Sequence, residues 1–123
     1  MIQCIRVYRV AIENAKAFVA AVRGANLWRE LSRQMSISPG LIGADLLKSQ
    51  ASGSLYISIE FWHSEEAYRA AEKSSAYPVY VLLLSQLTIS WTSIGIFSFP
   101  PTLEDQEFPE EAPTESMCRL KVN

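Results

Sequence analysis

The chain has 123 residues, of which 49% are hydrophobic and 20% are charged, and this size and composition suit one soluble globular domain with a substantial core. The net charge is −2, and residues 1–99 are nearly neutral whereas residues 100–123 are acidic. A nearly neutral body favours neither nucleic acid nor an anionic membrane surface as a partner.

Neither the start of the chain nor its longest apolar run indicates a membrane segment. The chain begins with a strand pattern rather than a signal peptide, and its longest apolar run, 79–84, is too short to cross a bilayer. Cys4 and Cys118 are too few for a disulfide framework, so we interpret them as reduced thiols. We therefore expect a cytoplasmic protein without a membrane partner.

The hydrophobic pattern predicts strands and helices in the order β-α-β-β-α-β. Strands are expected at 3–10, 41–48, 55–62 and 91–99. One long helix is expected at 13–35, and a second helical region at 65–73 and 75–88 is interrupted at Ser74 and Ser75. This order is typical of the ferredoxin-like α+β fold, in which two helices pack on one face of a four-stranded antiparallel sheet.

The third strand passes directly into a helix, and this corner is the first candidate for a functional site. Ser64 can cap the helix, with Glu65 and Glu66 placed favourably at the positive end of the helix dipole. The strand alternates between two sets of side chains: Leu55, Ile57, Ile59 and Phe61 on one face, and Tyr56, Ser58, Glu60 and Trp62 on the other. Glu60 would need a buried partner such as Arg6 or Arg9 if it points into the domain.

Two of the predicted strands are apolar on both faces. In the second strand Leu41 and Leu47 oppose Ile42 and Leu46, and in the fourth strand Trp91, Phe97 and Phe99 oppose Ile94 and Ile96. Because two helices cover only one face of the sheet, the other face needs a partner, and a symmetric homodimer would supply one. The sequence therefore predicts a domain at 1–99 that dimerises.

The tail, 100–123, is rich in proline and acidic residues, and we expect it to pack on the domain or on its dimer partner. Cys118, Leu120 and Val122 alternate with basic residues, a pattern that a short edge strand would also show.

Three motifs resemble a known family. Pro39–Leu41 before the second strand, Trp62–Tyr68 at the strand–helix corner and Ser75–Tyr77 at the later helix are similar to the antibiotic biosynthesis monooxygenase family, over about residues 2–99. The resemblance implies a ferredoxin-like protomer in a dimeric α/β barrel, with one pocket between the sheet and the helices. Members include cofactor-independent monooxygenases that oxidise phenols or quinols with O2, haem-degrading enzymes, and proteins with no known reaction.

The haem-degrading branch uses an Asn in the first strand, and a Trp and a His beyond the corner. The asparagines of this chain lie elsewhere, at Asn14, Asn26 and Asn123, and Ala71 and Val81 occupy the other two positions. We therefore do not expect haem degradation. One His and two distant Cys also form no metal-binding pattern, so we expect neither a metal nor another cofactor.

The branch that acts on polycyclic phenols places an Asn four residues before the corner Trp and a Tyr six residues after it. These positions hold Ser58 and Tyr68, around Trp62. The resemblance thus implies catalytic roles for Trp62, Tyr68 and Ser58, although a serine lacks the paired donor and acceptor of an amide.

Three neighbours, Tyr56, Tyr77 and His63, are candidate substrate-binding residues. Two of them have a plainer interpretation as well: Tyr77 as a core residue and His63 as a solvated one. Two functions remain open: a cofactor-independent monooxygenase for a phenolic or quinol small molecule, and a dimeric binding or structural module of the same fold without catalysis.

Overall fold

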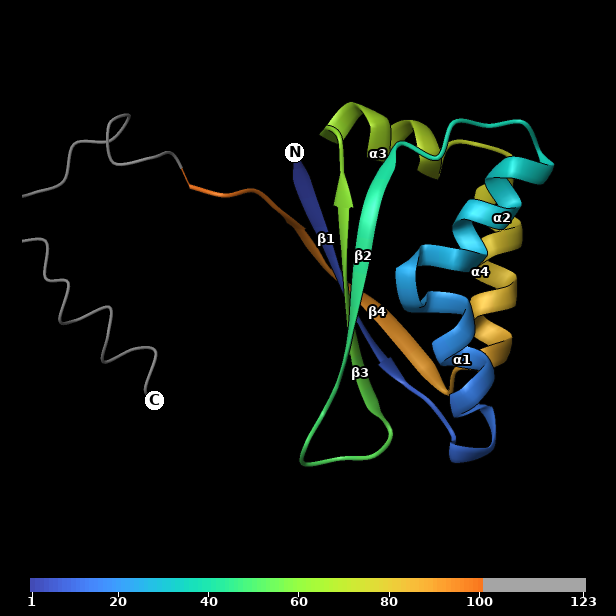
Figure 1. The fold of residues 1–123 in the computed structure, drawn as a ribbon, viewed down its shortest axis with the longest axis vertical. Coiled ribbons are helices and arrows are strands. Elements are labelled where there is room, and N and C mark those ends of the chain that lie inside the picture. Colours follow the sequence, from blue (N-terminus) through green and yellow to red (C-terminus); the bar gives the residue numbers. More distant parts are fainter. Residues whose placement is uncertain (101–123) are drawn as a thin grey trace, which may run out of the picture.

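The computed structural model describes residues 1–100, in which helices cover one face of an antiparallel sheet (Figure 1). The strands are β1 (Ile2–Arg9), β2 (Leu41–Lys48), β3 (Leu55–Trp62) and β4 (Ser90–Phe97), in the spatial order β2-β3-β1-β4. The helices are α1 (Ala15–Val22), α2 (Asn26–Gln34), α3 (Glu65–Glu72) and α4 (Ala76–Leu87), with short 3-10 turns at Ile12–Asn14 and Arg23–Ala25. This architecture confirms the predicted ferredoxin-like α+β fold. The expected packing of the tail and its edge strand lie outside the described residues.

The single long helix predicted over 13–35 is wrong, because the chain turns sharply between α1 and α2. Gly24 and Ala25 have φ angles of 65° and 58°, in the left-handed region that ends a right-handed helix. The turn allows two short helices to lay an apolar side against the sheet. Their buried apolar side chains are Phe18, Val22, Trp28 and Leu31.

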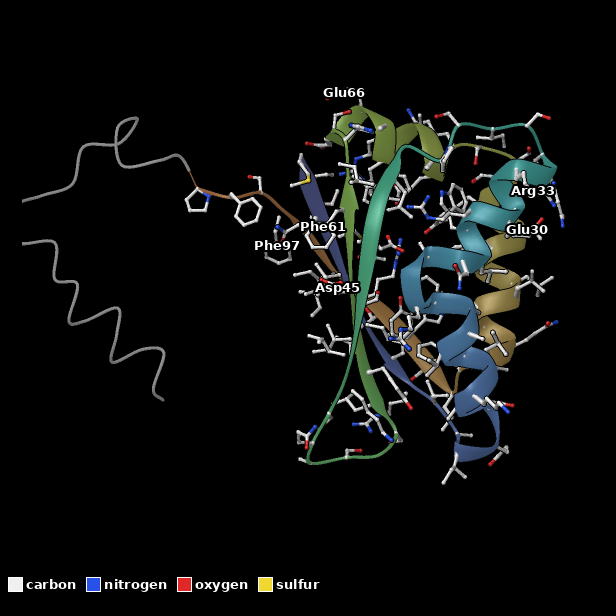
Figure 2. The ribbon with its side chains drawn as sticks, in the orientation of Figure 1. Glu30, Arg33, Asp45, Phe61, Glu66 and Phe97 are labelled. Atoms are coloured by element: carbon white, nitrogen blue, oxygen red, sulfur yellow. The ribbon has the colours of Figure 1, made fainter. Side chains whose placement is uncertain are left out.

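The helices cover the face of the sheet that carries the more polar half of β3. Tyr56, Ser58, Glu60 and Trp62 are all buried on this face. The apolar half of β3 points away from the helices, and Phe61 is seen there together with Phe97 of β4 (Figure 2). The inward face of the protomer is therefore unusually polar for a core, which makes it a place to look for a site.

Two bulges change which side chains share a face, and this corrects the prediction for β2 and β4. The pairing of β2 with β3 skips Ile42, and the pairing of β4 with β1 skips Ile94. One extra residue reverses the alternation, so Leu41 is buried under the helices whereas Leu47 is 54% exposed on the open face. Both faces still carry apolar side chains. Within residues 1–100, no helix has the length and apolar character needed to cross a membrane.

Candidate functional site

The corner between β3 and α3 is fixed by the cap that the sequence predicts. The Ser64 hydroxyl oxygen accepts a hydrogen bond from the Ala67 backbone N–H at 3.1 Å, and Glu65 and Glu66 occupy the first turn of α3. This cap sets the start of α3, and the next turn then carries Tyr68 over Trp62. The two rings meet edge to face, with centroids 5.3 Å apart.

The loop before β2 packs closely against Trp62 and against the first turn of α3. Gly40 has a φ of 63°, and a Cβ at this position would lie 3.2 Å from the Ala67 Cβ and 3.5 Å from the Trp62 ring. Only glycine allows the backbone to approach this closely in a left-handed conformation. The loop, β3 and α3 therefore hold Trp62 in one position.

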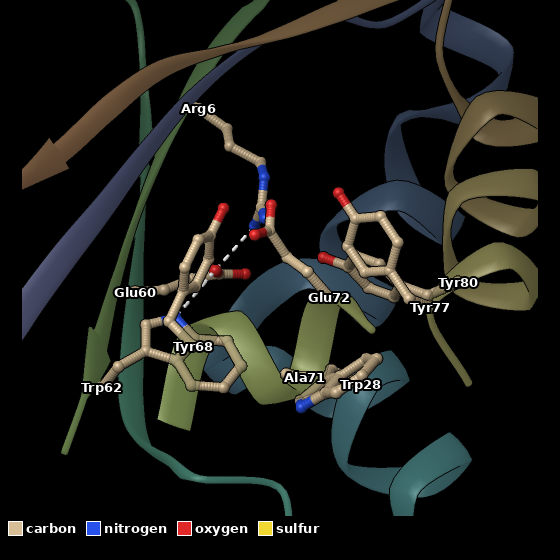
Figure 3. Close-up of a pocket in the computed structure, with 9 residues that line it drawn as sticks. All are labelled: Arg6, Trp28, Glu60, Trp62, Tyr68, Ala71, Glu72, Tyr77 and Tyr80. Carbon is tan, nitrogen blue, oxygen red and sulfur yellow. Dashed lines mark hydrogen bonds and ion pairs between the residues drawn. The ribbon is translucent and has the colours of Figure 1, made fainter. Parts of the chain in front are cut away.

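A small buried cavity lies beside Trp62, between the sheet and the helices (Figure 3). Its aromatic lining comes from Trp28, Trp62, Tyr68, Tyr77 and Tyr80, and its charged lining from Arg6, Glu60 and Glu72. The cavity volume is about 10 Å³, which is close to the space that one water molecule needs. The side chains thus fill most of the site and leave room for roughly one oxygen-sized atom.

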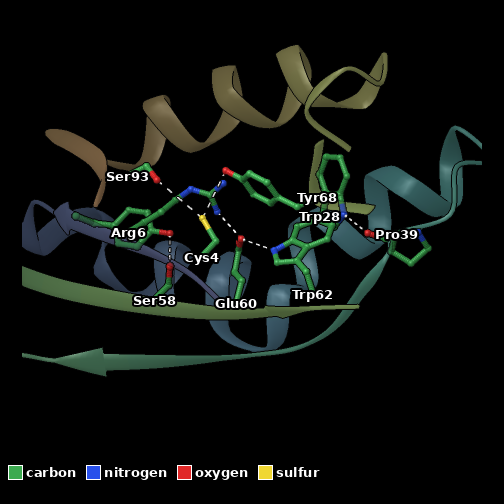
Figure 4. A network of polar contacts seen from close by, with 10 residues as sticks. Cys4, Arg6, Trp28, Pro39, Ser58, Glu60, Trp62, Tyr68 and Ser93 are labelled. Atoms are coloured by element: carbon green, nitrogen blue, oxygen red, sulfur yellow. Dashed lines mark hydrogen bonds and ion pairs between the residues drawn. The ribbon is translucent and has the colours of Figure 1, made fainter. Parts of the chain in front are cut away.

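An ion pair forms the polar wall of this cavity. Arg6 Nη1 lies 2.6 Å from Glu60 Oε1, and the two side chains are only 2% and 5% exposed. The Trp62 indole N–H donates to the same carboxylate oxygen at 3.2 Å (Figure 4). Burial disfavours the charge on Arg6, but the Glu60 carboxylate together with Tyr80, Cys4 and Tyr8 more than compensates, so the pKa of the guanidinium lies above its usual value. The partner predicted for Glu60 is confirmed as Arg6.

A second buried polar pair lies further along β1 and β3. The hydroxyl oxygens of Tyr8 and Ser58 are 2.6 Å apart, and neither residue is exposed. Burial raises the pKa of Tyr8 to about 12. Ser58 is not among the residues that line the cavity, because its hydroxyl is directed to Tyr8.

The other tyrosines of the site are also kept neutral. Burial raises the pKa of Tyr68, whose hydroxyl oxygen lies 3.6 Å from the Cys4 thiol. Burial likewise raises the pKa of Tyr80. At neutral pH these phenols are hydrogen-bond donors and not charges.

A larger, open cleft adjoins the cavity on its outer side. Its volume is about 550 Å³, and it lies between α3, the start of α4 and the edge strand β4. Tyr68, Glu72 and Tyr77 line both the cleft and the cavity, so these side chains separate the two spaces. The Glu72 carboxylate accepts a hydrogen bond from the Arg69 guanidinium at 3.1 Å, which fixes one part of this partition.

The structure brings some of the candidate residues together and separates others. Trp62, Tyr68 and Tyr77 line the cavity, and Ser58 lies behind it under Tyr8. His63 is exposed in the turn after β3. Tyr56 lies six residues back along β3, a separation of about 20 Å in an extended strand.

The cavity lining includes six residues that the sequence did not indicate as site residues: Arg6, Trp28, Glu60, Ala71, Glu72 and Tyr80. Trp28 lies on an apolar stripe of the first helical region and Tyr80 lies in the apolar second part of the later one, and such positions are typical of core residues. Glu72 had no sequence signal, since an acidic residue late in a helix is ordinary surface. Arg6 alternates along β1 with Cys4 and Tyr8, and this alternation, together with the need of Glu60 for a partner, is the sequence signal for the charged wall.

Residues 1–100 contain no group of three or more His, Cys, Asp and Glu side chains that could hold a metal ion.

Solved structures with the same fold come from several organisms. A mutant of SnoaB, a cofactor-independent oxygenase from Streptomyces nogalater, superposes with a TM-score of 0.62 at 22% identity, over 83% of this chain and 95% of that one. A conserved protein of unknown function from Bacteroides thetaiotaomicron gives 0.57 at 22% identity, over 80% and 96%. A conserved protein from Methanosarcina mazei gives 0.57 at 17% identity, over 80% and 92%. At these identities the likeness shows the fold.

No curated protein matches the chain. The family model described as "Antibiotic biosynthesis monooxygenase" matches residues 1–81, which is well over half of the chain and includes the β3–α3 corner. The resemblance drawn from the sequence motifs is thereby confirmed. The chain belongs to the antibiotic biosynthesis monooxygenase family.

Proposed function

We propose that this protein is a cofactor-independent monooxygenase that oxidises a phenolic or quinol small molecule with O2. The observation that carries the proposal is the buried cavity at Trp62, where aromatic side chains surround one ion pair. Such a site suits an electron-rich aromatic ligand whose oxygen must be bound and deprotonated. Membership of the family and the fold shared with SnoaB, a cofactor-independent oxygenase, add support.

In the proposed reaction, the deprotonated substrate is the reductant and O2 is the oxidant. For an anthrone-like substrate, one ring methylene and one O2 become a carbonyl and one water, so atoms and electrons balance without another reagent. Trp62 and Tyr68 would hold the aromatic ring by edge and face contacts. Ser58 would act indirectly, by holding the hydroxyl of Tyr8.

Tyr77 lines the cavity and is proposed to bind substrate at its outer wall. The other two candidate substrate-binding residues, Tyr56 and His63, are less favoured. Tyr56 lies far from the cavity along β3, and His63 is exposed. A role for either would require a second contact with a long substrate.

One observation favours the second candidate in its form of a structural module without catalysis. The cavity has a volume of about 10 Å³, whereas sites for small organic ligands are usually about 300–1,000 Å³. A substrate must therefore use the outer cleft or displace side chains. A module that has lost its reaction would have no need of that space.

Oxygen consumption with a panel of hydroquinones and anthrones separates the two candidates. A monooxygenase should consume O2 above the rate of substrate autoxidation, and Trp62→Phe and Tyr68→Phe should each lower kcat/KM by about tenfold or more. Absence of turnover across the panel, or turnover that both variants leave unchanged, favours the module.

We further propose that the protein is a homodimer formed through the open face of the sheet. This face carries apolar side chains from all four strands, namely Ile5, Val7, Leu47, Ile57, Ile59, Phe61 and Phe97, and helices cover only the opposite face (Figures 1 and 2). An uncovered apolar sheet of this kind is a usual contact surface. Asp45, directly opposite Ile59, is a charged residue on the same face.

Sedimentation velocity at micromolar concentration tests the dimer. The unmodified protein should sediment as a dimer, and Ile59→Lys should shift it to a monomer. Ile12→Lys is the matched control, because Ile12 is 89% exposed and lies outside the sheet. A monomeric unmodified protein contradicts the proposal.

A further inference from the structure

Arg6 is buried without enough partners for its guanidinium. The residue is 2% exposed, and among the described residues its Nε and Nη1 atoms have no aligned hydrogen-bond acceptor, although Nη1 lies 2.6 Å from the Glu60 carboxylate. Buried polar groups are nearly always satisfied, and an unsatisfied charged donor is expensive. An unpaired donor in the wall of a cavity indicates that an acceptor atom of a ligand belongs there.

The size of the space identifies how much of the ligand can reach Arg6. The cavity of about 10 Å³ accommodates roughly one oxygen atom, and the adjoining cleft of about 550 Å³ accommodates an aromatic body. Tyr68, Glu72 and Tyr77 line both spaces. Figure 3 shows these three side chains among those that line the cavity. A ligand that rests in the cleft could therefore insert one oxygen between these side chains.

The charge of the site limits the form in which that oxygen can be bound. Arg6 and Glu60 together are neutral, so an added phenolate would leave one uncompensated negative charge in a buried site. If Glu60 takes the proton of the ligand, the total charge does not change. Tyr68 and Tyr80 do not compete as bases, because burial keeps both phenols protonated.

We infer that Arg6 and Glu60 form the acid–base pair of the site: Glu60 receives the proton of a phenolic or enolic hydroxyl, and Arg6 holds the resulting oxyanion. The O–H bond of the ligand breaks, an O–H bond forms on the carboxylate, and the electron pair stays on the ligand oxygen. No electrons leave the ligand in this step. The class of ligand rests on the proposed function, but the proton transfer does not require that oxidation follows.

Binding of para-nitrophenol, whose anion is yellow, tests this inference without any oxidation. At a pH where the free probe is colourless, the protein should bind it as the yellow anion with little net release of protons to a weakly buffered solution. Glu60→Gln should still bind the anion but release about one proton per bound probe, because its amide cannot take the proton. The methyl ether para-nitroanisole should bind about tenfold more weakly than the phenol.

A double variant shows whether the charges themselves are responsible. Arg6→Met/Glu60→Met replaces the pair with apolar side chains and should remain folded by circular dichroism, but it should not produce the yellow anion. Arg33→Met/Glu30→Met is the matched control, since it removes an exposed ion pair on α2 and should bind like the unmodified protein.

Several results would overturn the inference. These are no binding of the probe at millimolar concentration, a yellow anion on the double Met variant, equal affinity for the ether, or equal proton release by the unmodified protein and Glu60→Gln. The outcome is independent of turnover. A yellow complex in a protein that consumes no O2 refutes the monooxygenase alone, and turnover that survives in the double Met variant refutes this inference alone.

Discussion

Replacing Ser58 with alanine should destabilise the protein by about 1–3 kcal/mol, because it leaves the hydroxyl of Tyr8 without a partner in a dry site. The two hydroxyl oxygens are 2.6 Å apart and both residues are fully buried. The change from serine to alanine removes one atom and creates little empty space, so the lost hydrogen bond should dominate. At about 4 °C per kcal/mol for a domain of this size, the Tm should fall by roughly 4–12 °C.

Urea denaturation of the two single variants and the double variant measures this interaction. Ser58→Ala and Tyr8→Phe each leave one buried hydroxyl without its hydrogen-bond partner, whereas the double variant removes both hydroxyl groups. We expect the double variant to lose at least about 1 kcal/mol less than the sum of the single losses. All variants should show the same m-value, so that the midpoints report stability alone.

Ser32 provides a matched control for the substitution. It is 1% exposed, and its hydroxyl has no hydrogen-bond partner among residues 1–100. Ser32→Ala should therefore be neutral or slightly stabilising. If Ser58→Ala is equally neutral, or if the single losses simply add in the double variant, the buried pair does not stabilise the fold and the proposed indirect role of Ser58 is refuted.

Three other outcomes are expected from the same core. Arg6→Met alone should cost about 3–5 kcal/mol in denaturant unfolding, because the buried Glu60 side chain then loses its counter-ion, and a loss below about 1 kcal/mol would contradict a buried ion pair. Gly40→Ala should lower the free energy of unfolding by at least about 1 kcal/mol and alter Trp fluorescence. Gly53→Ala is the control and should not destabilise the protein, because a Cβ at this position would have no atom within 4 Å. The free energy of unfolding should fall as pH rises from about 10 to about 12, because the pKa of Tyr8 is near 10 in the unfolded chain and about 12 in the folded protein. This difference stabilises the folded state below pH 10 by up to roughly 2.7 kcal/mol. A melting temperature that stays constant over this pH range would contradict the prediction.

The local elements of the fold could be predicted because their signals lie within a few residues. The alternation of β3, the Ser64 cap and the two acidic residues after it depend on spacings of two to four positions. The same alternation in β1 indicated that Arg6 points inward, and a buried Glu60 needs a cation. The sequence thus indicated Arg6 or Arg9 as the partner of Glu60, and the structure selects Arg6.

The turn inside the first helical region was not accessible in the same way. Gly24 weakens the helical pattern, but one glycine in a helix is often tolerated. The second left-handed residue, Ala25, has no sequence signal, because alanine favours a helix. Packing of both α1 and α2 against the sheet outweighs that local preference.

The sequence by itself determined the order of the strands and helices, the corner at Trp62 and the membership of a family, since these follow from short periodic patterns and motifs. The tertiary structure decided which side chains of β2 and β4 lie under the helices, because a bulge in each strand reverses the alternation and depends on the neighbouring strand. It also decided that Ser58 binds Tyr8 while Glu60 and Trp62 face the cavity. These contacts join segments about fifty residues apart, and no local pattern specifies them.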